Sequence, residues 1–335
     1  MTLASASVEA ALPEAVGPLS TAVIDLLVGR QARAATLPIA GTDPYGLDLQ
    51  LALYVCYELA YRGFAGVDPE FEWDPDLLRL RNDLERHFVA AVAADVGEIG
   101  PDDTASAEMD ALSVEPVDGD GPSYYLRDHG TWEQMREYFV HRSLYHLKEA
   151  DPHAFAIPRL TGQAKASFVA VEFDEYGAGR GEHLHQQLFA DLLAAADLDN
   201  NYLGYLADVP AEALAVVNLM SYFGLHRSMR GAAIGHFAAT EITSSPGSRR
   251  LVDALERMGA PQPCVAFYRE HVEADAVHEQ VVRTDVVDDL IAREPHLEAN
   301  VVFGMRALDV VENRLAEHVM TNWKAGRSSL RRPLS

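Results

Sequence analysis

The sequence predicts an all-α protein, and three observations support this expectation. Apolar residues recur at helical spacing along most of the chain, for example in residues 47–64, where Leu47, Leu51, Val55 and Leu59 lie four positions apart. No stretch alternates apolar and polar residues between hairpin turns, which is the pattern of exposed β-strands. The chain also lacks a GxGxxG after a strand, a Walker loop and a GxSxG elbow, which accompany parallel sheets. We therefore expect roughly ten helices and no sheet.

The composition of the chain limits which binding partners and which cellular compartment can be expected. A chain of 335 residues with 48% hydrophobic and 23% charged residues is typical of a folded protein of one large or two smaller domains. A net charge of -24 argues against nucleic acid and anionic membranes as partners, because both repel an acidic surface. Cys56 and Cys264 form no CxxC motif, so we expect reduced thiols. No signal peptide is evident, and the most apolar window, 211–240, is interrupted by charges. We expect a cytoplasmic protein.

The first third of the chain is predicted to form a helical arm that carries no candidate catalytic or metal-binding residues. Residues 1–18 are expected to be a loose leader, and the helix over residues 47–64 is followed by another that starts at Asp74 and Pro75. Residues 97–123 are rich in Gly, Pro, Asp and Ser, which predicts a long exposed loop. We therefore divide the chain into an N-terminal dimerisation region, a bundle and a disordered tail, at residues 1–122, 123–325 and 326–335.

One acidic residue stands out in the arm. Glu58 lies in an otherwise apolar helix, where an unpaired acid is costly to bury. Two interpretations are open: Glu58 forms an ion pair with Arg62 one turn later, or it is functional. The ion pair is the favoured interpretation.

The remaining two thirds of the chain are predicted to form successive helices. The first is stopped by Asp151 and Pro152, because the residue before a proline disfavours helical geometry. Another predicted helix ends in a stretch that contains three glycines, Gly177, Gly179 and Gly181, after which the helical pattern restarts. The predicted helices cover residues 131–153, 162–181, 182–198, 211–226, 231–258, 268–291 and 299–323.

The strongest chemical signal is an HxxxDxxH pattern formed by His271, Asp275 and His278. At about 100° per residue, these positions lie within roughly 60° of one another on one helix face. Two imidazoles and a carboxylate form the ligand set preferred by non-haem iron with open positions for oxygen. The zinc motif HExxH fits less well, because it needs histidines at i and i+4. The alternative is a solvated acidic helix on which two histidines happen to align.

Four further acids and histidines occur in apolar helical surroundings upstream. Glu241 follows the apolar run GAAIGHFAAT, Glu175 follows FVAV, His185 precedes QQLF, and Glu149 closes a helix. Each alone has an ordinary structural interpretation, such as a helix cap or a solvated helix end. Together they match dinuclear sites in helical bundles, which use bridging carboxylates and one histidine per iron.

At these residues the chain resembles the haem-oxygenase-like diiron oxidases, often described as iron-containing redox enzymes. The resemblance runs from Tyr125 to Trp323 and is carried by residues 148–160, 172–189, the helix with Glu241, and 271–278. It implies a haem-oxygenase-like helical bundle with an N-terminal helical arm. The metal ligands that it implies are Glu175, His185, Glu241, His271, Asp275 and His278, with Glu149 in the place of the additional carboxylate of N-oxygenating members.

The spacing of two implied ligands conflicts with a continuous helix. Ten residues separate Glu175 from His185, about 15 Å along a helix, so both could not reach one metal pair. The glycines between them permit a break that shortens this distance. Alternatively, Glu182 and His185 make the i, i+3 pair of ferritin-like sites. We prefer Glu175 on the resemblance and keep Glu182 as the alternative.

The resemblance implies an oxidoreductase with two iron ions, Fe(II) or Fe(III), and dioxygen as co-substrate. We expect an N-oxygenase (a diiron monooxygenase) acting on an amine or amino-acid-derived small molecule in secondary metabolism, with an external electron donor. The alternatives are a diiron oxidase that cleaves C–C bonds or decarboxylates a fatty or amino acid, and a metal-free helical binding protein. No catalytic residue is expected beyond the metal ligands. Substrate contacts are suggested for Tyr222, Arg227 and Arg230, and other supporting side chains for Tyr145, Tyr176 and His226.

The arm generates a prediction about assembly. Its Leu- and Val-rich helices carry no candidate chemistry, so we expect them to form a homodimer interface. Light scattering should give twice the mass of one chain. A monomer at micromolar concentration would contradict this expectation.

Overall fold

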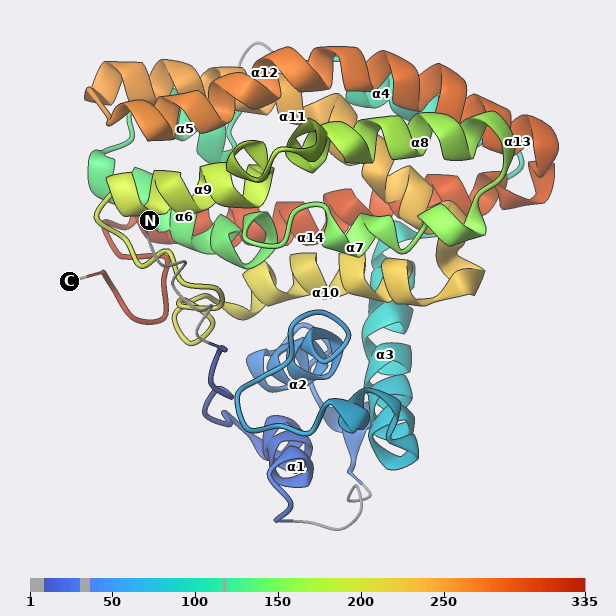
Figure 1. The fold of residues 1–335 in the computed structure, drawn as a ribbon, viewed down its shortest axis with the longest axis vertical. Coiled ribbons are helices and arrows are strands. Elements are labelled where there is room, and N and C mark those ends of the chain that lie inside the picture. Colours follow the sequence, from blue (N-terminus) through green and yellow to red (C-terminus); the bar gives the residue numbers. More distant parts are fainter. Residues whose placement is uncertain (1–8, 31–36, 117–118, 335) are drawn as a thin grey trace.

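All regular secondary structure in the described part of the chain is helical, which confirms the all-α prediction (Figure 1). The computed structural model describes residues 9–30, 37–116 and 119–334, except for the side chains of residues 273–277. The longer helices are α1 (Pro18–Leu27), α2 (Leu47–Glu58), α3 (Pro75–Val96), α4 (Ala105–Leu112), α5 (Pro122–Asp128), α6 (Trp132–His146), α8 (Gly162–Glu175), α9 (His185–Ala195), α10 (Ala211–Leu225), α11 (Arg230–Met258), α12 (Gln262–Val281) and α14 (Glu298–Lys324). The short ones are α7 (Asp151–Ala154) and α13 (Asp289–Arg293), and a π-helical segment, η7, spans Val282–Asp288.

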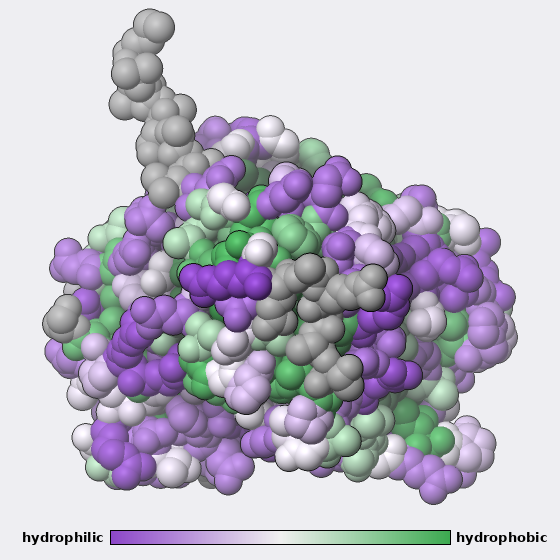
Figure 2. Space-filling model, turned by 90° about the horizontal axis from the view of Figure 1, so that it is seen from below, coloured by the Kyte–Doolittle hydropathy of each residue, from purple (hydrophilic) through white to green (hydrophobic). Residues whose placement is uncertain are grey.

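The helices form a layered bundle with the arm beneath it. In Figure 1, α8, α11 and α12 lie across the top, α6, α10 and α14 below them, and α1 and α2 at the bottom. The long helix α3 rises from the arm to the bundle and packs against α14. No helix in the described residues is long and apolar enough to cross a membrane. Seen from the side of the arm, the surface is mixed, with hydrophobic areas near its centre (Figure 2).

The arm shares a hydrophobic core with the bundle. One buried cluster contains side chains of α1, α2 and α3 together with those of α6, α9 and α10, such as Leu53, Phe88 and Phe223. A second cluster joins α8, α11, η7 and the first half of α14. The apolar faces of the arm helices are thus largely covered within one chain.

Two glycines let α11 and α14 approach closely at the centre of the bundle. A Cβ added to Gly235 would lie 1.9 Å from the carbonyl oxygen of Val301, and one added to Gly304 would lie 2.1 Å from that of Ala232. No side chain fits in this space, so the backbones themselves pack together. This contact fixes the helix that carries Glu241, six residues after Gly235.

Two segments are more ordered than expected from their composition. Residues 97–123 contain α4, whose start is capped by Thr104 accepting a hydrogen bond from the Ala107 amide, and whose Met109 is buried. The tail expected to be disordered lies on the bundle: the Ser329 amide donates to Glu137 Oε2 at 2.9 Å, and Leu330 is buried. A buried carboxylate needs donors, and the tail supplies them.

Glu58 is paired, but not with Arg62. Its Oε2 lies 3.0 Å from the ammonium of Lys148, and its Oε1 accepts a hydrogen bond from the Tyr202 hydroxyl at 2.7 Å. Arg62 offers Glu58 only its backbone amide, while its guanidinium bonds to the Leu147 carbonyl. The expected ion pair was therefore assigned the wrong partner, because the true one lies 90 residues away in sequence.

We predict that the Glu58→Gln substitution lowers the free energy of unfolding by about 3–5 kcal/mol, because it leaves the Lys148 ammonium buried without its counter-charge. Both side chains are at most 1% exposed. Urea denaturation followed by circular dichroism measures the change. The control is Asp83→Asn, which removes an exposed ion pair with Arg86 and should cost less than about 1 kcal/mol. Equal losses in the two variants would contradict the prediction.

Candidate metal centre

Two groups of buried carboxylates and imidazoles meet inside the bundle, and one residue belongs to both. The first group consists of Glu149, Glu175, His185 and His271, and the second of Glu175, Glu241 and His278; within each, the candidate ligand atoms lie within 4.8 Å of one another. The side chains come from five segments: the turn after α6, which carries Glu149, and the helices α8, α9, α11 and α12. Asp275, the remaining implied ligand, lies among the residues whose side chains are not described.

A glycine turn brings Glu175 and His185 together. Glu175 is the last residue of α8 and His185 the first of α9, and His185 Nδ1 lies 2.7 Å from Glu175 Oε2. Between them the chain turns at Gly177 and Gly179, whose φ angles are 66° and 79°. The helix is therefore broken at the glycines, and the 15 Å separation of a continuous helix does not arise. The alternative residue, Glu182, is exposed.

Gly177 is required in this turn for a steric reason as well. A Cβ at this position would lie 2.5 Å from the carbonyl carbon of His183 and 2.6 Å from the amide nitrogen of Leu184. The backbone just before His185 thus packs directly on the backbone just after Glu175.

His271 is oriented by its own helix. Its Nδ1 lies 2.8 Å from the Phe267 carbonyl oxygen, which can only accept, so this nitrogen carries the proton of the neutral ring. Its Nε2 then presents a lone pair toward Glu149, whose Oε1 is 3.7 Å away. This backbone contact is the usual way in which proteins orient a metal-binding histidine.

His278 and Glu175 connect the two groups. His278 Nδ1 lies 3.2 Å from Glu241 Oε2 and 3.6 Å from Glu175 Oε1. On its other side, His278 Nε2 lies 3.3 Å from Asp174 Oδ2, a carboxylate that can hold the ring proton. Glu175 thus directs Oε2 to His185 in the first group and Oε1 to His278 in the second, which is the arrangement of a bridging carboxylate.

A hydrogen-bond network positions Glu149. His146 Nδ1 lies 2.9 Å from Glu149 Oε2. Gln186 donates to the Glu149 carbonyl at 2.6 Å and to Asp151 Oδ1 at 3.1 Å, and Asp151 also accepts from the Tyr176 hydroxyl at 3.0 Å. Sequence reasoning missed His146, although its position three residues before Glu149 places both on one side of a helix turn.

Glu172 is a second residue that sequence reasoning missed. It lies one turn before Glu175 on α8, is 2% exposed, and neither of its oxygens has a hydrogen-bond partner among the described residues. Burial, reinforced by the charges of Glu175 and Glu241, raises the pKa of Glu172 to about 9. The sequence did not single out Glu172, because an acid in FVAVEFDE resembles the solvated acids at an ordinary helix end.

The electrostatics of the site call for a cation. Three buried carboxylates, on Glu149, Glu175 and Glu241, lie near one another beside imidazoles, whereas Glu172 with its raised pKa is a neutral carboxyl near pH 7. Burial opposes ionisation of Glu149, yet His146 and His271 hold its pKa well below the usual range. Burial likewise disfavours the charged form of His185, but Glu175 raises its pKa. Protons on imidazoles thus balance the carboxylates, and a bound metal ion would replace them. Hard carboxylate oxygens with imidazole nitrogens suit iron or manganese.

A cavity of about 310 Å³ reaches this centre. Its lining includes Tyr145, His146, Glu149 and His271 at one end, with Thr240 and Ser244 of α11 beside them. Glu149 and His271 of the first group are therefore accessible to a small molecule, whereas Glu175, His185, Glu241 and His278 do not line this cavity.

The structure does not bring the suggested substrate-binding residues to the centre. Tyr222 stacks on His226, with ring centroids 4.5 Å apart, and His226 Nε2 lies 3.0 Å from Glu85 of α3. Arg230 pairs with Glu294, and Arg227 is exposed. None of these lines the cavity that reaches the ligands.

Comparison with known proteins agrees with this geometry. The model of a protein family described as "iron-containing redox enzyme" matches residues 136–311, more than half of the chain. The chain belongs to this family. It is therefore an iron-containing oxidoreductase, an oxidase or oxygenase, with a haem-oxygenase-like all-α fold.

One relative found by sequence comparison has a more specific name. Nitrosourea synthase from Streptomyces achromogenes subsp. streptozoticus is 23% identical over 145 residues, which cover 43% of this chain. The aligned part is 31% of that relative, so the chain matches less than a third of its length.

We predict that Gly177→Ala prevents normal iron loading, because the added Cβ pushes the His183–Leu184 backbone, and with it His185, away from Glu175. The matched control is Gly179→Ala, where φ is also positive but the nearest side-chain atom, on Phe173, is 3.7 Å away. The control should lose about 1–2 kcal/mol of stability and keep its iron. Metal analysis of both variants after ferrous loading measures the difference. Full iron content in Gly177→Ala would show that the turn does not position the ligand.

Proposed function

We propose that the protein is an oxygen-dependent diiron N-oxygenase that adds oxygen to an amine nitrogen of a small molecule. The observation that carries this proposal is the pair of ligand groups sharing Glu175, with Glu149 as a further carboxylate in the first group. In the resemblance described above, that further carboxylate marks N-oxygenating members. The relative's name points the same way, because a nitrosourea carries an oxygen atom on nitrogen.

In this proposal Glu149, His185 and His271 would hold one iron ion, Glu241 and His278 would hold the other, and Glu175, which belongs to both groups, would serve both. Asp275 would complete the second set. When bound, the iron pair supplies the activation of dioxygen. The balance of the reaction is one amine, one dioxygen, two electrons and two protons giving one hydroxylamine and one water. The electrons come from an external donor.

The residues around the ligands have supporting roles. His146 holds Glu149 Oε2, so that Oε1 faces His271. Asp174 accepts the Nε2 proton of His278, which leaves Nδ1 for metal. The burial of Glu175 and His185 keeps bulk water from the bridge. Because Glu149 and His271 line the cavity, the substrate nitrogen would approach the ion that they hold.

The two alternatives fit less well. A C–C-cleaving oxidase or decarboxylase would leave Glu149 as a structural helix end and would use an apolar cavity. Glu149 is instead 5% exposed among the other ligands, and the cavity is lined by Arg142, Asp309 and Glu312 in addition to apolar groups. A metal-free binding protein is disfavoured by membership of an iron-containing family.

The proposal also includes assembly as a homodimer through the arm, with residues 123–325 as the diiron domain. Most of the apolar surface of the arm is covered by the bundle, so the support comes from what remains outside: Trp73, two residues before α3 and 70% exposed, and the hydrophobic areas on the arm side of the molecule (Figure 2).

The test is turnover of an amine panel by ferrous-loaded protein with a chemical reductant and isotope-labelled dioxygen. We expect two iron ions per chain, and products that carry labelled oxygen on nitrogen when measured by mass spectrometry. The Glu149→Ala variant should bind the first ion weakly and lose this activity, because the first group then keeps only Glu175, His185 and His271, and Glu175 is shared with the second group. Release of carbon dioxide without oxygen on nitrogen would overturn the proposal in favour of the decarboxylase.

A further inference from the structure

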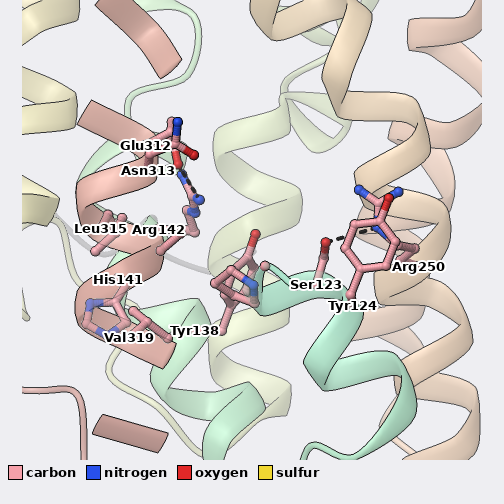
Figure 3. A pocket seen from close by; sticks show the side chains of 13 residues that line it. Ser123, Tyr124, Tyr138, His141, Arg142, Arg250, Glu312, Asn313, Leu315 and Val319 are labelled. Carbon is pink, nitrogen blue, oxygen red and sulfur yellow. Dashed lines mark hydrogen bonds and ion pairs between the residues drawn. The ribbon is translucent and has the colours of Figure 1, made fainter. Parts of the chain in front are cut away.

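Glu172 on α8 is a buried acid that belongs to neither ligand group. It is 2% exposed, and neither of its carboxyl oxygens has a hydrogen-bond partner among the described residues. The charged groups of a nearby cavity show the usual arrangement instead. In this cavity of about 290 Å³, lined by α5, α6, α11 and α14, Arg142 holds Glu312 at 2.6 Å and 2.8 Å (Figure 3). A buried polar group without a partner is costly, and a bound ion is one of the few explanations for it.

The position of Glu172 places it beside the second ligand group. It lies three residues before Glu175 on α8, so the two side chains are neighbours on one helix face, with Cβ atoms about 5–6 Å apart. Burial raises the pKa of Glu172 most, and the charges of Glu175 and Glu241 raise it further. These two acids come from different helices and form the second group together with His278. Glu172 therefore faces this group rather than the solvent.

The side chains around Glu172 do not provide the missing partner. Burial, and after it neighbouring acids that include Glu172, raise the pKa values of Tyr145 and Tyr176, so both rings lie near Glu172. Yet the Tyr176 hydroxyl donates to Asp151 Oδ1 at 3.0 Å, and Tyr145 donates no hydrogen bond to Glu172. In the part of the chain that the structure describes, no cationic side chain pairs with Glu172 either. A bound cation would supply the partner.

We propose that Glu172 is a further ligand of the metal centre and coordinates the ion that Glu241 and His278 would hold. The inference rests on the proposed function, because it needs an ion at the second group. The ligand set implied by the resemblance does not include Glu172. Its oxygens lie outside both groups of close ligand atoms, so the side chain reaches the ion by rotating about its own bonds while α8 stays in place.

Coordination by Glu172 requires the loss of one proton. With its raised pKa the group is a neutral carboxyl near pH 7, whereas the ligand is the carboxylate. One neutral Glu172 and one ferrous ion therefore give one carboxylate–iron bond and one proton released to solvent, with no change of oxidation state. The adjacent cation offsets the cost of charging a buried carboxyl, and a hard carboxylate oxygen suits iron.

The Glu172→Gln substitution separates a metal ligand from an inert buried acid. The amide has the size and neutrality of the protonated carboxyl, so thermal unfolding of the variant without iron should match that of the unaltered protein. The amide cannot become an anion, so it attracts the ion less strongly. Anaerobic titration of the full chain with ferrous ions should show one ion bound as before. The other should bind at least about tenfold more weakly, the scale on which even substitutions outside the ligand shell act.

Mössbauer spectroscopy of the protein loaded with ⁵⁷Fe gives a second measurement. In the Glu172→Gln variant the quadrupole splitting of one ion should change while that of the other stays the same. The matched control is Glu182→Gln, which alters an exposed acid in the turn before α9 and should match the unaltered protein in both measurements. A crystal structure of the unaltered, ferrous-loaded chain should show a Glu172 oxygen bonded to iron, and this result does not depend on a variant.

Equal ferrous affinity and identical spectra in Glu172→Gln would overturn the proposal and leave Glu172 as a neutral acid. Loss of folding in this variant would also contradict it, because the substitution preserves size and neutrality. Failure of the proposed function would look different: iron would bind with the expected dependence on Glu172, but no product would carry oxygen on nitrogen. The titration needs neither dioxygen nor an amine, so the two results are independent.

Discussion

The structure depends on the accommodation of buried negative charge. Glu149, Glu175 and Glu241 come from three separate segments, and the fold holds them in an interior where an isolated carboxylate is very costly. Imidazoles lie beside them: His146 and His271 hold the pKa of Glu149 low, and Glu175 raises that of His185, so protons are favoured on nitrogen. The close contact of α11 with α14 and the glycine turn before α9 both serve to bring these groups together. A bundle built only for stability would have apolar side chains in their place.

The part of the site that sequence reasoning could predict was local. The helical spacing of residues 271–278 placed two histidines on one face, and in the structure both turn toward carboxylates of the cluster. The joint occurrence of acids and histidines in apolar helices also pointed to Glu175, His185 and Glu241. Helical periodicity likewise sufficed for the all-α class. It is a property of short windows, and so it can be read from one sequence.

What sequence reasoning could not predict was set by contacts between distant segments. The partner of Glu58 could not be found by looking one turn along its helix, because Lys148 arrives from another part of the chain. Composition made residues 97–123 and the tail look unstructured, although a short helix and a buried Leu330 lie within them. The cavity beside the candidate ligands carried no signal in the sequence, because its walls come from α6, α10, α11, α12 and α14. A cavity forms only when distant segments of the chain pack together.

The Glu58–Lys148 pair has a consequence for how this protein can change over time. The part of the chain that matches its family begins at residue 136, so the arm lies outside that match. Yet an arm carboxylate neutralises the lysine next to Glu149, and two arm tyrosines, Tyr54 and Tyr61, cover its ammonium. The arm and the bundle must therefore be retained together when the protein changes during evolution. A recombination event that exchanged the arm for an unrelated segment would leave the Lys148 ammonium without its counter-charge, next to the candidate metal ligand Glu149.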